Sequence, residues 1–160
     1  MRLTRAGLLL AASLLSVMPA QAADETPAMP SGEGVELEYT GQDGTPIKTI
    51  FPIYQAGAIR YFSAGIGADE RAATYPPFPL KLIFVAGSNA YLAQVAVTIT
   101  DTKGATVFVP GEQVTGPWLF VDLPAGTYDI TAIRRDRSEV KQRVEIKPPG
   151  VRTVYFRWKD

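Results

Sequence analysis

The chain has 160 residues, with 16 basic and 16 acidic side chains, no histidine and no cysteine. Without histidine and cysteine it cannot build a Ser-His-Asp or Cys-His catalytic group, a thiol redox centre or an ordinary zinc or copper site. Its balanced charge offers no basic excess for nucleic acid or for an anionic membrane surface. We therefore expect no cofactor and no metal centre, with carboxylate chemistry and a hard cation such as calcium as the remaining options.

The N-terminus has the pattern of a secretory signal peptide over residues 1–22. Arg2 and Arg5 precede an uncharged apolar run, and small residues follow it at Ala20 and Ala22. That run is shorter than the roughly 20 apolar residues of a membrane-spanning helix, so we expect no membrane anchor. The sequence predicts cleavage near Ala22 and a periplasmic or secreted protein with two more acidic than basic side chains.

The next segments predict a leader and an N-terminal extension. Residues 23–34 are rich in Pro, Ala, Gly and Glu, which is typical of a flexible leader. Residues 35–79 form the predicted extension, with short strands of alternating apolar and polar residues and one helical turn that a proline-rich stretch ends. The expected strands are 35–39, 47–53 and 58–62, and the expected helical turn is 67–73.

Residues 80–160 predict an all-β domain. Period-two alternation recurs between short turns, which favours an antiparallel sandwich of about seven strands with one wet face on most of them. A parallel sheet would need long helical crossovers, and none is visible. The expected strands are 80–85, 93–100, 105–109, 118–123, 127–133, 139–146 and 151–158.

Two segments carry a resemblance to a known family. Residues 93–99 read Ala-Gln-Val-Ala-Val-Thr-Ile, and residues 123–130 read Leu-Pro-Ala-Gly-Thr-Tyr-Asp-Ile. Together they resemble the carboxypeptidase regulatory-like domain, a small sandwich similar to transthyretin (prealbumin-like). The resemblance covers about residues 80–158 and implies a fold, with little about function. Tyr128 is expected to pack its ring into the core while its hydroxyl reaches the backbone.

The chain also departs from that family. Residues 111–118 replace the usual Thr-Asp-x-x-Gly, and residues 61–71 lie outside the domain pattern. The latter segment resembles the N-terminal extension of small exported proteobacterial proteins that carry this domain. The similar transthyretin-related hydrolase uses histidines, so its activity is not implied for this chain.

The loop of residues 63–71 is the densest polar cluster beside glycines. One interpretation is a binding loop, in which backbone amides and Arg71 face an acidic group, or Asp69 and Glu70 face a cation. The other is a turn followed by a capped helical stub whose acidic residues favour the helix dipole. Ser63 belongs to the same candidate surface.

Aromatic residues give a second candidate surface. Trp118 and Phe120 alternate with Leu119 and Val121, so one of the two sets must face away from the core. If Trp118 and Phe120 are exposed, with Tyr91 as a third ring, they form a stacking platform for sugar rings or an apolar patch for a partner. The alternative is that Trp118 covers one end of the sandwich.

These observations favour a non-enzymatic exported protein with a binding or structural role in the cell envelope. Its expected partner is an envelope protein or a glycan, recognised through open strand edges and end loops. Lys81, Lys141 and Arg143 are candidates for guarding such edges instead. The alternatives are a carbohydrate-binding module that uses surface aromatics and a carboxylate-dependent hydrolase, although the adjacent Asp69 and Glu70 point in different directions.

Overall fold

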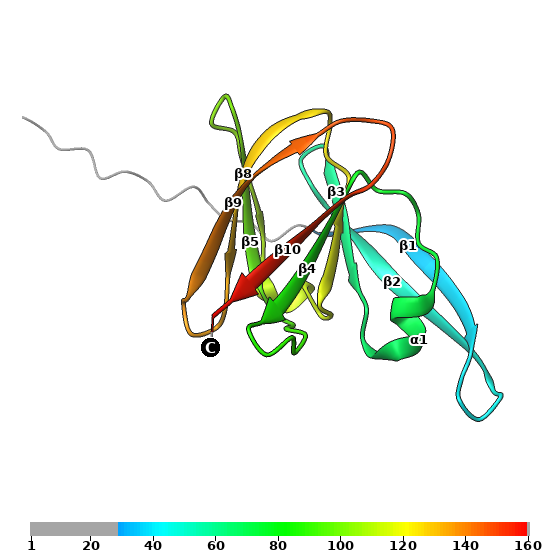
Figure 1. Ribbon diagram of the computed structural model, residues 1–160. Coiled ribbons are helices and arrows are strands. Elements are labelled where there is room, and N and C mark those ends of the chain that lie inside the picture. The colour runs from blue at the N-terminus through cyan, green and yellow to red at the C-terminus, as the bar shows by residue number, and fades with distance from the viewer. Residues whose placement is uncertain (1–28, 160) are drawn as a thin grey trace, which may run out of the picture.

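The computed structural model describes residues 29–159, and the side chains from residue 34 onward. Within that range the chain forms two open sheets packed as a sandwich, with ten strands and one short α-helix (Figure 1). The elements in chain order are β1 (Met29–Thr40), β2 (Pro46–Ala56), β3 (Ile59–Ala64), α1 (Gly67–Ala72), β4 (Leu80–Ala86), β5 (Ala96–Asp101), β6 (Thr106–Val109), a 3-10 turn η1 (Gly111–Gln113), β7 (Trp118–Val121), β8 (Gly126–Ile133), β9 (Glu139–Ile146) and β10 (Arg152–Trp158).

The six-stranded sheet has the order β1-β2-β3-β7-β4-β10, and the four-stranded sheet has the order β6-β5-β8-β9. Strands β4 to β10 are the seven strands predicted for the C-terminal part. The prediction of a wholly antiparallel fold is wrong, because β10 pairs parallel with β4, Val154 lying opposite Leu82. The physical reason is that the chain leaves β9 in one sheet and crosses to the other, so no hairpin sets the direction of β10.

The predicted signal peptide lies outside the described residues, as does most of the predicted leader. The last part of that leader is a strand. β1 begins at Met29, whereas the sequence predicted that the first strand begins at residue 35. Pairing with β2 extends the hairpin, with an irregularity between Pro30 and Gly34. The extension is also part of the sandwich, since β3 pairs with β7 and places Tyr61 opposite Val121.

The inner core fills the space between the two sheets, and the predicted alternation accounts for it. One face of each strand in residues 80–158 is buried there, and large side chains such as Phe84, Leu119 and Phe156 are fully inaccessible. Tyr128 packs in this core, and its hydroxyl donates a hydrogen bond to the Pro124 carbonyl oxygen over 2.8 Å, as expected.

An outer core lies on the opposite face of the six-stranded sheet. Its buried residues come from β1, β2, β3, β4 and β7, and from the proline-rich segment of residues 73–79 that follows α1. Phe62 stacks on Phe120 with ring centroids 4.6 Å apart, and Tyr75 lies against both rings. The six-stranded sheet is therefore buried on both faces over much of its width.

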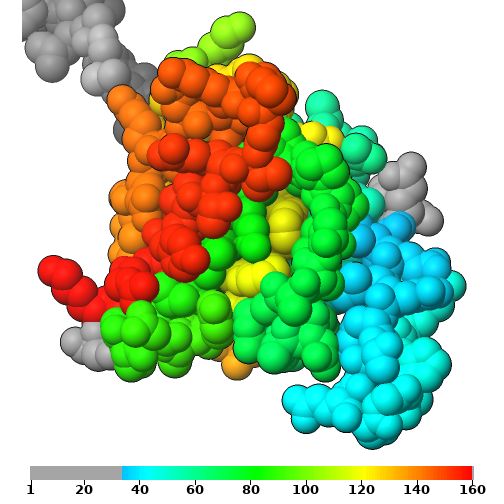
Figure 2. All heavy atoms as spheres, turned by 45° about the vertical axis from the view of Figure 1, so that its right-hand side comes forward, coloured from blue at the N-terminus to red at the C-terminus, as the bar shows by residue number. Residues whose placement is uncertain are grey.

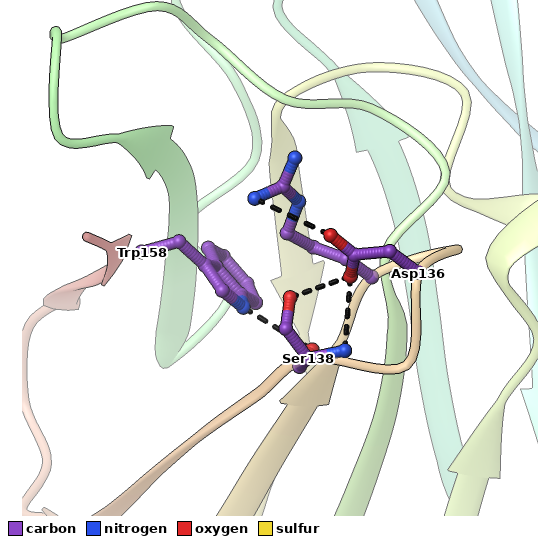
Figure 3. Close-up of polar contacts among 4 residues, drawn as sticks. Asp136, Ser138 and Trp158 are labelled. Atoms are coloured by element: carbon purple, nitrogen blue, oxygen red, sulfur yellow. Dashed lines mark hydrogen bonds and ion pairs between the residues drawn. The ribbon is translucent and has the colours of Figure 1, made fainter. Parts of the chain in front are cut away.

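The sandwich is held together at the side where β9 and β10 lie near each other. The indole N–H of Trp158 donates to the Ser138 carbonyl oxygen over 3.2 Å, and the Ser138 N–H donates to the Asp136 carboxylate over 2.9 Å (Figure 3). Farther along, the Gln142 side-chain amide donates to the Tyr155 carbonyl oxygen over 2.6 Å. Side chains thus link strands that belong to different sheets.

Candidate functional site

Ser63, on β3, is buried and acts within the fold. Its Oγ accepts a hydrogen bond from the Gly116 N–H over 3.0 Å and donates one to the Trp118 carbonyl oxygen over 2.9 Å. These bonds tie the end of β3 to the bend before β7. Ser63 is therefore not a surface ligand, and its hydroxyl holds the backbone that positions Trp118.

Glu70 and Arg71 also bind the loop that carries them. The Glu70 carboxylate accepts hydrogen bonds from the Gly65 N–H (2.9 Å) and the Ile66 N–H (2.8 Å). The Arg71 guanidinium donates to the Gly65 carbonyl oxygen over 3.0 Å. The two amides that a binding loop would offer to an acidic ligand are thus occupied by Glu70, and the capped-stub interpretation accounts for these contacts.

Trp118 and Phe120 do not form an exposed platform. They face away from the inner core, as alternation with Leu119 and Val121 required, but only 7% of Trp118 and 5% of Phe120 remain exposed. The physical reason is the outer core, in which Tyr75 packs against both rings and covers them. Trp118 covers the outer face of the sheet, and the predicted position at the end of the sandwich is wrong.

Gly65 allows the loop to approach Trp118 closely. Its φ is +96°, and a Cβ placed there would lie 2.9 Å from the indole ring. Both facts favour glycine at this position. The loop of residues 63–71 and Trp118, two candidates from distant parts of the sequence, therefore form one neighbourhood.

Lys81 lies at the open side of this neighbourhood. Its Nζ is 3.3 Å from the centroid of the Trp118 ring and 5.5 Å from that of Phe120. Burial lowers the pKa of Lys81, because water that would stabilise the ammonium is partly excluded. Beneath it, the Trp118 indole N–H is buried and has no hydrogen-bond partner among the described residues. Since β4 is an interior strand, the prediction that Lys81 guards a sheet edge is wrong.

The outer face of β10 continues this surface without a cover. Tyr155 is 54% exposed, and Thr153 and Arg157 on the same face are exposed as well. Figure 2 shows this side of the molecule, with β10 in red and atoms of β7 in yellow visible between β10 and the green segment that follows β3. Exposed aromatic and basic side chains therefore border the covered rings.

A shallow groove separates β1 from α1 on the far side of the outer core. It is lined by apolar or small side chains of both elements and by two carboxylates, Glu38 and Asp69. The side chain of Glu38 is 72% exposed, and its carboxylate lies 3.8 Å from the Lys48 ammonium. Asp69 thus lines a groove that Arg71 and Trp118 do not line, so the loop of residues 63–71 contributes to two surfaces.

Sequence reasoning missed Lys81 as a site residue, and also Tyr155. A signal for Lys81 exists, because it interrupts the apolar run of residues 80–85, which is typical of a strand buried on both faces. A charged residue inside such a run needs a particular environment, and the two rings supply it here. Nothing local in the sequence identifies Tyr155, since its place depends on β10 pairing with β4.

Comparison with known proteins identifies no family for this chain, because no family model, no curated protein and no solved structure matches it. Among residues 29–159, no three acidic side chains gather as a metal site would require. In the same part of the chain, no helix has the length and apolar character to span a membrane.

Proposed function

We propose that the protein is a non-enzymatic binding protein of the cell envelope, exported and cleaved near Ala22, which recognises a partner at the open edge of β1. The observation that carries this proposal is the length of that edge. Strand β1 spans 12 residues and, within residues 29–159, has a hydrogen-bonded neighbour on one side alone. The backbone groups on its other side are available for a further strand.

The remaining sheet edges are less suited to strand addition. β6 has four residues, and the edges of β9 and β10 lie near each other, where Gln142 donates to the Tyr155 carbonyl oxygen. The groove between β1 and α1 is lined in part by β1, and the half-buried Tyr39 there is available to an apolar side chain of an added strand. Length, access and an adjacent groove thus favour β1.

The carboxylates of the same groove help to distinguish a binding role from a catalytic role. They belong to Glu38 and Asp69, the pair that a carboxylate-dependent hydrolase would use. A carboxylate that acts in catalysis usually lies where water is partly excluded, whereas the Glu38 side chain is largely in solvent and lies near Lys48. This exposure supports a binding role for the groove.

The resemblance to the carboxypeptidase regulatory-like domain is part of this proposal. Two observations support it, namely the two-sheet sandwich and the hydrogen bond from Tyr128 to the turn at Pro124. Domains built in this way are compatible with a binding or structural role, so the proposal needs no catalytic group. Cell fractionation and the mass of the mature N-terminus test export and cleavage near Ala22.

Site-specific photo-crosslinking tests the β1 edge. A photoreactive amino acid replaces Glu38 on β1, or Glu145 on β9 as a matched control, since both are exposed glutamates within edge strands. Irradiation of intact cells is expected to give a product of defined mass from position 38 and none from position 145. Equal products from both positions, or none from position 38, would contradict recognition at β1.

A further inference from the structure

The register of the strands defines a patch on the outer face of the six-stranded sheet. Three columns stand side by side: β10, β4, and β7 continued by Tyr91, which bridges to Val85 where β7 has ended. We call it the outer patch. Its three rows are Thr153–Lys81–Phe120, Tyr155–Ile83–Trp118 and Arg157–Val85–Tyr91.

The outer patch is open along β10 and at Tyr91. Tyr155 is 54% exposed and Tyr91 is 49% exposed, whereas Ile83 and Val85 between them are buried. Rows are roughly 7 Å apart along a strand and columns about 5 Å apart, so the patch has the dimensions of two or three sugar rings. The floor is apolar, and two tyrosine rings border it.

The outer patch also carries positive charge without negative partners. Lys81 on its first row and Arg157 on its third take part in none of the ion pairs found among the described residues, and neither does Arg71, whose guanidinium lies 4.7 Å from the Tyr91 ring centroid. Elsewhere, lysines and arginines on β2, β3 and β9 pair with carboxylates. For example, Arg143 binds Asp129 through two hydrogen bonds. Outside the outer patch, Lys103, Arg135, Arg137 and Arg152 also take part in no ion pair among the described residues.

Two donors of the patch have no acceptor among the described residues. The Lys81 ammonium lies over the Trp118 ring, and the buried N–H of that ring has no partner in the described part of the chain. The other tryptophan, Trp158, does have an acceptor in the Ser138 carbonyl oxygen. A half-buried ammonium without an anionic partner among the described residues favours a ligand that brings anionic oxygen atoms.

We propose that the outer patch binds an acidic oligosaccharide, with a sugar carboxylate paired to Lys81 and sugar rings stacked on Tyr155 and Tyr91. Aromatic faces suit the apolar faces of sugar rings, and the unpaired cations suit carboxylate groups. A peptide ligand fits this face less well, because the backbone groups of β4 and β7 already bond to strands on both sides and β10 is bonded on the side of β4. The Nη1 of Arg157 donates hydrogen bonds to the Ala86 carbonyl oxygen and to the Asn89 side-chain oxygen, and these bonds position the guanidinium at the end of the patch.

Calorimetric titration with trigalacturonate, and with neutral galactotriose as the uncharged probe, tests the proposal. The wild-type protein is expected to bind trigalacturonate and to bind galactotriose at least about tenfold more weakly, because a charge-assisted hydrogen bond is lost. No heat with trigalacturonate overturns the proposal, and so does equal binding of the two sugars.

Matched variants locate the site. Lys81→Met keeps the apolar stem and is expected to weaken trigalacturonate binding about tenfold or more. Lys103→Met removes the same charge from the exposed β5–β6 turn and should leave binding unchanged. Equal losses in both variants would mean attraction by net charge alone and would overturn the assignment, as would unchanged binding in Lys81→Met.

A second variant guards against a folding defect in the first. Tyr155 is half-exposed, so Tyr155→Ala should keep the fold and weaken binding by about threefold to tenfold through lost stacking. Triglutamate serves as the competing probe, and displacement of trigalacturonate at similar concentration would overturn the assignment to a saccharide. The outer patch and the β1 edge are separate surfaces, so this experiment and the crosslinking experiment fail or succeed independently.

Discussion

The two faces of the six-stranded sheet are both buried, but they are covered in different ways. The inner face packs against a complete second sheet, and its polar groups find partners, as Trp158 does with Ser138. The outer face is covered by residues 73–79, which pack over β3 and β7 but leave β10 open. There, among the residues that the structure describes, the Trp118 N–H has no hydrogen-bond partner and Lys81 has no ion-pair partner.

The difference between the two faces indicates that they have different roles in this fold. A sheet packed on a sheet gives a close-packed interior that stabilises the molecule. A short loop-like cover gives a smaller core and leaves a border where aromatic rings and cations meet solvent. We infer that the inner face provides stability and that the outer face provides recognition.

The largest expected effect separates the two cores. Phe84→Ala in the inner core should lower the free energy of unfolding by about 3–5 kcal/mol, because the rigid sheets cannot close the cavity. Phe120→Ala in the outer core should cost less, since residues 73–79 can settle into the space. Urea unfolding of both variants measures the difference, and an equal or larger loss in Phe120→Ala would contradict the comparison.

A buried hydroxyl gives the next effect. Ser63→Ala should lower the free energy of unfolding by about 1–3 kcal/mol, because the buried Gly116 N–H loses its acceptor. Ser138→Ala is the control, since the Ser138 side chain is exposed and its carbonyl oxygen still accepts from Trp158. Urea unfolding midpoints of the two variants measure this difference. If Ser63→Ala left the free energy of unfolding unchanged, the backbone on the outer face would be held by other contacts.

Alkaline pH should act on both faces through tyrosines. Burial raises the pKa of Tyr61, in the inner core, and of Tyr75, over the outer core, to about 12 each. The unfolded chain releases these protons at lower pH than the folded chain, so stability is complete below pH about 10 and falls as pH rises towards 12. Unfolding midpoints at pH 9 and 11 should differ less in Tyr75→Phe than in the wild type. An unchanged pH dependence would contradict this origin.

The smallest effect is expected at the exposed edge of the four-stranded sheet. Arg143 and Asp129 form a bidentate pair in solvent, and the pair depresses the pKa of Asp129 through its hydrogen bonds. Exposed pairs contribute little to stability, so Arg143→Ala should leave the thermal midpoint nearly unchanged. A shift as large as that of Ser63→Ala would show that this edge is more important than the comparison allows.

Much of the inner face was predictable from the sequence. Alternation placed Val97, Ile130 and Phe156 inward, and all three are buried between the sheets. Such patterns are readable because a strand with one buried face repeats every two residues. The predicted strand ends were also close to the observed ones. For example, β9 spans residues 139–146, as predicted.

The outer face was not predictable in the same way. Alternation indicated that Trp118 and Leu119 point in opposite directions, but it gave no sign that residues 73–79 return to cover Trp118. The parallel pairing of β10 with β4 depends on a crossing between sheets, and so does the position of Tyr155 beside Ile83. Long-range contacts of this kind leave no local pattern in the chain.

The indole N–H resonances of the two tryptophans test the comparison most directly. In a proton–nitrogen correlation spectrum, with Trp118→Phe to assign the signals, trigalacturonate is expected to shift the Trp118 signal, because Lys81 lies on that ring. The Trp158 signal, held by Ser138 at the edge of the inner core, should stay in place. A spectrum in which Trp118 stays fixed, or in which both signals move alike, would contradict the assignment of recognition to the outer face.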